Sequence, residues 1–176
     1  MGVMLRIAIV GISGTGKTTY ARKLSALTGL SLHHMDSLFW RGEWEAVPEK
    51  LYISAQSLLI AKSDWIIEGY IDPALSERAH AADLIIDLDF PGWLCAWRVI
   101  LRWLRHRSSA RAELPKEATE RLRLRFLWIV LSRAERPAID AALAMVDPAK
   151  IRHVTSLTEL NAVTVAITQS LPNVVG

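Results

Sequence analysis

The fold is decided by the stretch Gly11-Ile12-Ser13-Gly14-Thr15-Gly16-Lys17-Thr18. Its spacing matches the pattern G-x-x-x-x-G-K-[ST] in full, which is typical of loops that hold the phosphates of a nucleoside triphosphate. Glycines allow the backbone to turn successive N–H groups inward, and the start of the following helix adds the positive end of its dipole. We refer to residues 11–18 as the phosphate loop.

The phosphate loop predicts two cofactors, ATP and Mg²⁺. Lys17 is expected to reach the outer phosphates as a point charge, and the hydroxyl of Thr18 is expected to ligate the metal. The residues expected to bind the nucleotide are Gly11, Ser13, Gly14, Thr15, Gly16, Lys17, Thr18 and Thr19. The alternative interpretation is a glycine turn without a ligand, which the flanking strand and helix disfavour.

The sequence on either side of the loop predicts alternating strands and helices. An aliphatic run over residues 5–10 is typical of a strand buried on both faces, and a helix is expected over 16–28. Further strands are expected over 30–35, 65–68, 83–89 and 150–154. We therefore predict a three-layer α/β P-loop NTPase fold, with a five-stranded parallel sheet, right-handed crossovers and helices on both faces.

Helices are also expected to begin at Pro48, Pro91 and Ser156, and a long one is expected over residues 118–136. Within the long helix, residues 126–131 are apolar all round, which predicts deep burial there. Pro137 interrupts the pattern, and a short helix follows it. Residues 106–117 break periodicity and are expected to form a loop.

Length, charge and cysteine content limit the class of protein. The chain has 176 residues, so one domain over residues 1–176 is expected. Its net charge of +3 suits a protein that handles phosphates but is weak evidence for nucleic acid. The single cysteine, Cys95, excludes an intrachain disulfide, and no apolar run reaches the roughly 18 residues of a membrane span. We expect a cytoplasmic protein without a membrane partner, either a monomer or a homodimer.

Three acids follow the predicted strands, where ligands of parallel sheets bind. Glu68 closes a hydrophobic run and is predicted to hold Mg²⁺ through water, with Gly69 allowing close approach of the acceptor. Asp36 is predicted to be a catalytic base or an anchor for the acceptor hydroxyl. Each acid has a simpler interpretation as a helix N-cap or a solvated turn. For Asp89 this interpretation is favoured, because it precedes the helix that begins at Pro91.

Two histidines, His33 and His34, come just before Asp36. They alternate sides of a strand, so at most one faces the cleft. No further ligands stand at metal-binding spacing, so an ordinary structural role is favoured for both.

Arginines are concentrated between positions 98 and 136. Arg98, Arg102 and Arg105 share one helical face, and Arg121, Arg123, Arg125, Arg133 and Arg136 follow. We interpret the set as an arginine-rich helical lid, with its mobile segment at about 104–120, that closes over the triphosphate and excludes water. The alternatives are a solvated basic face and a nucleic-acid patch.

A GTPase is disfavoured by the motifs. The guanine-reading pattern Asn-Lys-x-Asp does not occur in the chain. Asp89-Phe90-Pro91-Gly92 matches the GTPase pattern D-x-x-G, but it runs directly into the helix predicted from Pro91, so we interpret it as a chance match.

Several segments resemble the bacterial topology-modulation protein family, which belongs to the adenylate-kinase-like P-loop kinases. Besides the phosphate loop, they are His34-Met35-Asp36-Ser37-Leu38-Phe39-Trp40, Trp65-Ile66-Ile67-Glu68-Gly69-Tyr70, Asp89-Phe90-Pro91 with Trp93-Leu94-Cys95, and Arg136-Pro137. The family has Asp where this chain has Glu68. The resemblance implies that Arg98 and Arg102 are phosphate-binding arginines, because their spacing from Pro91 is similar to that in adenylate kinases.

The motifs and the resemblance together predict a kinase that transfers the γ-phosphoryl group of ATP to a small acceptor, such as a nucleotide or nucleoside. Its predicted catalytic residues are Lys17, Asp36, Arg98 and Arg102, and its predicted metal-binding residues are Thr18 and Glu68. The alternative is a nucleotide-dependent protein that binds DNA or modulates its topology, suggested by the arginines and by the family name.

Overall fold

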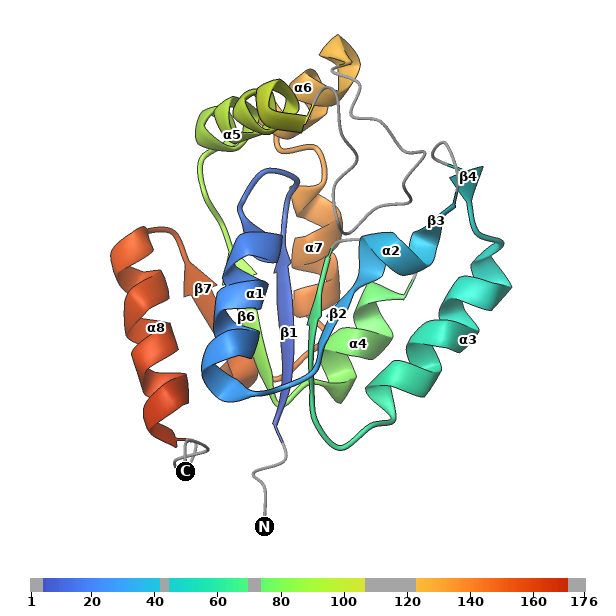
Figure 1. Cartoon of the computed structure of the whole chain (residues 1–176), viewed down its shortest axis with the longest axis vertical. Helices are drawn as coiled ribbons and strands as arrows, with labels where there is room; N and C mark the ends of the chain where they lie inside the picture. The colour runs from blue at the N-terminus through green and yellow to red at the C-terminus, as the bar shows by residue number, and fades with distance from the viewer. Residues whose placement is uncertain (1–4, 42–44, 70–73, 107–122, 171–176) are drawn as a thin grey trace.

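A parallel sheet of five strands forms the centre of the computed structural model, which describes residues 5–41, 45–69, 74–106 and 123–170. The strand order is β2-β5-β1-β6-β7, and every neighbouring pair is parallel (Figure 1). The strands are β1 (Arg6–Gly11), β2 (Leu32–His34), β5 (Trp65–Glu68), β6 (Leu84–Leu88) and β7 (Ile151–Val154). This order confirms the predicted α/β fold class.

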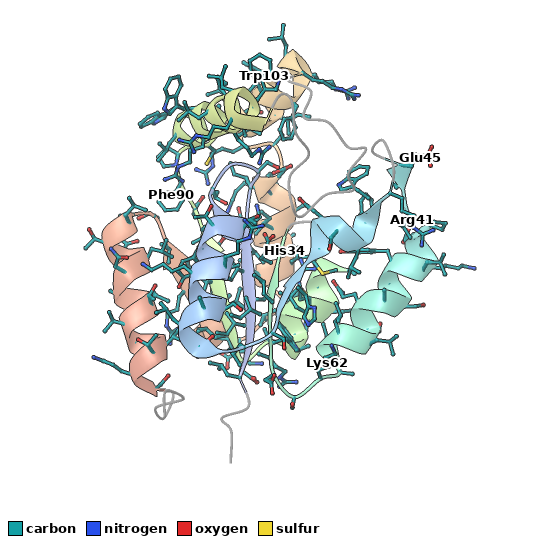
Figure 2. The ribbon with its side chains drawn as sticks, viewed as in Figure 1. His34, Arg41, Glu45, Lys62, Phe90 and Trp103 are labelled. Atoms are coloured by element: carbon teal, nitrogen blue, oxygen red, sulfur yellow. The ribbon has the colours of Figure 1, made fainter. Side chains whose placement is uncertain are left out.

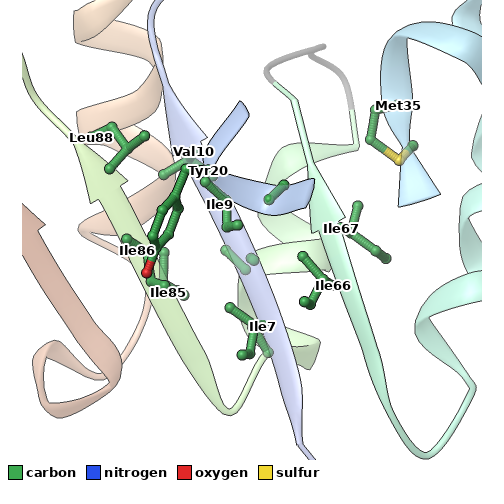
Figure 3. Close-up of a cluster of buried hydrophobic side chains, with 14 of the residues drawn as sticks. Ile7, Ile9, Val10, Tyr20, Met35, Ile66, Ile67, Ile85, Ile86 and Leu88 are labelled. Atoms are coloured by element: carbon green, nitrogen blue, oxygen red, sulfur yellow. The ribbon is translucent and has the colours of Figure 1, made fainter. Parts of the chain in front are cut away.

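The middle strand β1 is buried because helices cover both faces of the sheet. Ile7, Ile9 and Val10 are fully buried, as are the neighbouring Ile66 and Ile85 on β5 and β6 (Figure 3). The continuous aliphatic run that predicted β1 therefore reflects burial of this strand on both faces of the sheet.

Helices form the two outer layers. Contacts with the sheet place α1 (Lys17–Thr28) and α8 (Leu157–Ser170) on one face. On the other face, α4 (Leu75–Ala81) and α7 (Arg136–Leu143) contact β1, and α3 (Glu49–Ile60) packs against α4. The sequence did not reveal α4, because its seven residues are too few to show a helical period.

The remaining elements lie near the carboxyl ends of the strands or connect them. They are α2 (Met35–Phe39), the antiparallel pair β3 (Trp40–Arg41) and β4 (Glu45–Ala46), α5 (Gly92–His106), α6 (Leu124–Leu131) and the 3-10 turn η1 (Pro148–Lys150). Helices α5 and α6 pack together beyond the loop that joins β1 to α1, at the top of Figure 1. Gly92 allows this packing, because a Cβ there would lie 2.2 Å from the carbonyl oxygen of Leu131.

The long helix expected over residues 118–136 is wrong at its C-terminal end. Helix α6 ends at Leu131, and a turn follows in which Arg133 has a left-handed backbone with φ of 57°. Helix α7 then begins at Arg136. The predicted loop over 106–117, most of the lid segment at 104–120 and the start of the long helix fall outside the described residues.

The deep burial expected over residues 126–131 is also wrong. Val130 is fully buried, but Trp128 is 67% exposed and Leu124, at the start of α6, is 82% exposed. Of the described elements, α6 packs mainly against α5, so one stripe of its apolar surface is covered. An apolar sequence on every side of a helix therefore did not mean burial on every side.

Candidate active site

The phosphate loop lies at the carboxyl end of β1, where it turns into α1. The Nζ atom of Lys17 donates to the carbonyl oxygens of Gly11 at 2.7 Å and Ile12 at 2.8 Å. The buried hydroxyl of Thr15 also donates to Ile12, at 2.9 Å. These bonds fold the loop around the lysine ammonium.

Gly14 brings the loop into contact with α5. Its φ of 85° is in the left-handed region, and a Cβ there would lie 2.4 Å from the carbonyl oxygen of Cys95. A side chain at this position would therefore strain the backbone and push α5 away from the loop. Cys95 itself is fully buried.

Arg98 is the arginine of α5 that bonds to the phosphate loop. Its guanidinium donates to the carbonyl oxygen of Thr15 at 2.9 Å and lies 4.8 Å from the centre of the Phe90 ring. Arg102, one turn further along α5, is close enough for its charge to lower the pKa of Lys17. The structure therefore places Arg98 in contact with the loop and the charge of Arg102 within reach of Lys17, whereas Arg105, which was expected on the same face, is exposed.

Glu68 lies at the end of β5, and two side chains bond to its Oε1 atom. The hydroxyl of Thr18 donates to it at 3.0 Å, and Nδ1 of His34 lies 2.6 Å from it. Residues 34 and 68 are register partners on β2 and β5, so their side chains leave the sheet on the same side. Figure 2 labels His34 at this edge of the sheet. His34 is therefore the histidine of the pair that contacts Glu68.

The charge of Glu68 is stabilised in a nearly closed environment, where its side chain is 5% exposed. Burial, the largest influence, raises the pKa of the carboxyl, but the hydrogen bond with His34 and the charge of Lys17 outweigh it. The net result is a pKa below the ordinary value, so Glu68 is an anion at neutral pH.

Thr18 and Glu68 provide oxygen atoms, which are the ligands that Mg²⁺ prefers. Because Mg²⁺ usually keeps several water ligands, two protein oxygens beside a phosphate loop fit its requirements. Within the described ranges, no group of three or more His, Cys, Asp and Glu residues is placed to hold a metal by itself. A metal here would therefore depend on the nucleotide for further ligands.

The amine of Lys17 lies close enough to three carboxylates for their charges to affect its pKa. Burial is the largest influence and lowers the pKa of its amine, while the carboxylates of Glu68, Asp36 and Glu135 raise it. Asp36 lies in α2 rather than in a turn, and its charge reaches both Lys17 and the buried Arg78. Sequence reasoning thus placed Asp36 near the loop, and its role as base or anchor stays a prediction.

The other residues predicted to bind nucleotide belong to the loop or to α1. Ser13 bonds to Glu135, a residue that sequence reasoning missed. Gly16 has a φ of 95° and is exposed, and Thr19 is exposed on α1.

Sequence reasoning also missed a buried arginine behind Glu68. Arg78 on α4 is fully buried, and it donates to the carbonyl oxygen of Gly69 at 2.9 Å and to Oε1 of Gln56 at 2.7 Å. Gln56 in turn donates to the carbonyl oxygen of Ala74 at 2.8 Å. This chain of bonds fixes the backbone directly after Glu68. A fully buried arginine has no distinctive sequence signal, because most arginines are exposed.

The helix cap expected for Asp89 is not the interaction that the structure shows. Its carboxylate pairs with Arg133 and with Arg136, whose NH1 atom lies 3.4 Å away. Arg136 also makes two hydrogen bonds with the fully buried carboxylate of Asp87, at 2.8 and 2.6 Å. Two of the predicted lid arginines are thus paired with acids of the sheet edge, because the turn after α6 directs them there.

The other predicted lid arginines are less informative. Arg123 and Arg125 are exposed, and Arg121 lies outside the described residues.

Comparisons with known proteins support the fold. One solved structure that matches is entitled a "putative kinase" from Chloroflexus aurantiacus J-10-fl. It is 20% identical in sequence, the match covers 94% of this chain and 97% of that chain, and the TM-score is 0.60. No family model matches the chain, and no curated protein matches it. The resemblance to the topology-modulation family therefore stays a prediction.

The helices of the described segments were also compared with the dimensions of a bilayer. None of them combines the length and the apolar character that crossing a membrane requires.

Proposed function

We propose that this protein is an ATP-dependent kinase that transfers the γ-phosphoryl group to a small acceptor, such as a nucleotide or nucleoside. The observation that carries the proposal is the convergence of Lys17, Thr18 and Glu68 at the carboxyl edge of the sheet, with Arg98 bonded to the same loop. Phosphoryl transfer depends mainly on positioning and on stabilising charge, and these groups are suited to both.

The roles follow from the contacts. Lys17 and the backbone N–H groups of the loop bind the outer phosphates, and Arg98 and Arg102 approach them from α5. Thr18 and Glu68 would hold Mg²⁺, which would neutralise the negative charge that develops during transfer. His34 keeps Glu68 oriented through its 2.6 Å contact.

The acceptor binds, in this proposal, beside Asp36 and Gly69. An acceptor hydroxyl oxygen forms a bond to the γ-phosphorus, the bond between that phosphorus and the bridging oxygen breaks, and ADP leaves. Asp36 either accepts the hydroxyl proton or anchors the hydroxyl. Gly69 supports the acceptor side, because Arg78 holds its carbonyl oxygen and a Cβ there would lie 3.0 Å from Cβ of Met35.

The test combines nucleotide binding with transfer. The protein is titrated with Mg-ATP by calorimetry and then incubated with γ-labelled ATP and a set of nucleosides, nucleotides and other small hydroxyl compounds. Lys17→Ala should lose nucleotide affinity and transfer while keeping its circular dichroism spectrum. Lys23→Ala removes an exposed lysine of the same helix and should behave as the parent does.

Two results would count against the kinase. Equal ATP affinity in the parent and Lys17→Ala would mean that the loop's role is misassigned. Binding of duplex DNA much tighter than the roughly 10⁻⁴ to 10⁻⁶ M of nonspecific binding, without any transfer, would favour the DNA-directed alternative. That alternative is weakened by Arg133 and Arg136, which are paired with Asp89 and Asp87.

A further inference from the structure

One carboxylate lies inside the phosphate loop itself. The backbone N–H of Ser13 donates to Oε2 of Glu135 at 2.7 Å, and the Ser13 hydroxyl donates to Oε1 at 3.1 Å. Both donors belong to the segment whose N–H groups are expected to bind phosphate. A carboxylate that accepts two such bonds occupies the loop as an anion would, with charge-assisted hydrogen bonds.

The position of Glu135 is fixed by its neighbours. Arg136 holds the buried carboxylate of Asp87 with two hydrogen bonds, and Arg133 pairs with Asp89. Both acids come from the end of β6 and the residue after it, beside the phosphate loop. The left-handed backbone at Arg133 turns the chain so that the side chains of Arg133, Glu135 and Arg136 reach the edge of the sheet. The backbone of Glu135 is therefore anchored on both sides, and its own side chain is half-buried.

The charge of Glu135 acts on the centre of the proposed site. It is one of the carboxylates that raise the pKa of Lys17. A phosphate bound to Lys17 and to the loop would therefore meet a negative charge already in place. Repulsion between two anions at such close range is substantial in a partly buried environment.

We propose that Glu135 determines the affinity and specificity of the phosphate loop by competing with the ligand for Ser13. This inference rests on the proposed nucleotide site and deepens it. A ligand must supply enough phosphate oxygens and negative charge to replace the carboxylate at both Ser13 donors. Polyphosphates satisfy this condition, whereas a monophosphate that lacks the outer phosphates does not.

The competition has a measurable consequence. Removing the charge of Glu135 should strengthen the binding of every ligand whose phosphates reach Ser13. The expected gain is about tenfold to a hundredfold, the typical strength of a hydrogen bond to a charged group. The gain should fall as salt is raised, because the repulsion that it removes is screened.

The experiment is calorimetric titration of the parent and of Glu135→Gln with Mg-ATP, magnesium pyrophosphate and AMP. Glutamine has nearly the same shape as glutamate, and its single carbonyl oxygen can accept one of the two bonds from Ser13, so the variant removes the charge and one acceptor. Glu135→Ala provides a second variant that removes the whole contact. Glu77→Gln changes net charge equally at an exposed position of α4 and should leave every affinity within about twofold of the parent.

The expected result is tighter binding of Mg-ATP and pyrophosphate by both Glu135 variants, with little change for AMP. Unchanged or weaker polyphosphate binding in both variants would overturn the inference, even if the parent proves to be an active kinase. A different result would separate the two proposals. If pyrophosphate binds more tightly to the variants while Mg-ATP binds to none of the proteins, the competition is supported and the proposed kinase function is wrong. If none of the proteins binds either polyphosphate, both proposals are wrong.

Discussion

Arg136 and Arg78 both carry a positive charge into the interior beside the same sheet, but their partners differ. Arg136 is paired with carboxylates, among them the fully buried Asp87. Arg78 is itself fully buried, and within the described part of the chain it donates to neutral oxygens, those of Gly69 and Gln56. Both arginines lie on helices, α7 and α4, that pack against each other and against β1.

The difference teaches what each arginine does. A buried ion pair satisfies two charges at once, and removing one partner leaves the other charge buried and uncompensated. When a buried cation is bonded to neutral oxygens, no paired carboxylate neutralises it. Its charge therefore affects the ionisable groups around it. Burial is the largest influence and lowers the pKa of Arg78, while Tyr52 and then the charges of Glu68 and Asp36 raise it. Arg136 thus stabilises the fold, and Arg78 supports the anionic side of the proposed site.

The largest effect is expected from Arg136→Met. Asp87 would keep its buried charge and lose both guanidinium bonds, so the free energy of unfolding should fall by about 3–5 kcal/mol. Urea unfolding followed by circular dichroism measures the change. A loss of less than about 1 kcal/mol would mean that His153, whose Nδ1 lies 2.8 Å from Asp87, compensates for the arginine.

A smaller loss is expected from Arg78→Met, about 1–3 kcal/mol. The oxygens of Gly69 and Gln56 would lose their donor, but the cost of burying a cation would also disappear. The same urea experiment applies, with Arg125→Met at an exposed position of α6 as the control for an arginine substitution. If Arg78→Met destabilises the protein as much as Arg136→Met, the proposed contrast between the two arginines is wrong.

The contribution of Glu68, one of the acids near Arg78, can be tested by varying the pH. Because the folded state lowers the pKa of Glu68, its ionisation contributes stability above the pKa of the unfolded chain, about 4.3. That contribution should disappear as pH falls through the lower folded-state pKa. Urea midpoints between pH 6 and 3 should therefore drop less in Glu68→Gln than in the parent. Glu49→Gln, at an exposed position, should keep the parent's slope.

The smallest effect is expected from changing Asp140, the exposed carboxylate that is paired with Arg136. Asp140 bonds to Arg136 at 2.7 Å, but its side chain is 56% exposed. Asp140→Asn should therefore cost less than about 1 kcal/mol, because solvent screens such pairs. Thermal melts at low and high salt provide the measurement, and the difference between parent and variant should vanish at high salt. A loss comparable to that of Arg136→Met would show that the ion pairs of Arg136 with Asp140 and with Asp87 are energetically coupled.

Much of the fold was predictable because its signals are local. The aliphatic run of β1 and the glycine spacing of residues 11–18 identify a strand, a loop and a helix within one short segment. The shared face of Arg98 and Arg102 on α5 is a local signal of the same kind, whereas their role at the phosphates was implied by the resemblance to adenylate kinases. What joins residues on one helix face or at one strand end can be inferred without knowledge of the tertiary structure.

The interactions that sequence reasoning missed all join distant segments. Glu135 and Ser13 are separated by 122 positions, and Arg136 and Asp87 by 49. The contact of His34 with Glu68 depends on the register between β2 and β5, which no local pattern specifies. The wrong helix end after Leu131 has the same origin, because the turn there is stabilised by partners on β6 and in the phosphate loop.

The central position of β1 has a consequence for biosynthesis. Arg6 pairs with Trp65 and Ile7 pairs with Leu84, so β1 has no partner until much later segments leave the ribosome. At about 5–20 residues per second, the delay between Arg6 and Trp65 is on the order of 3–12 s. During this time a strand that is buried in the folded protein is exposed on the nascent chain. A slow or paused translation before β5 should therefore favour aggregation or capture by chaperones over folding.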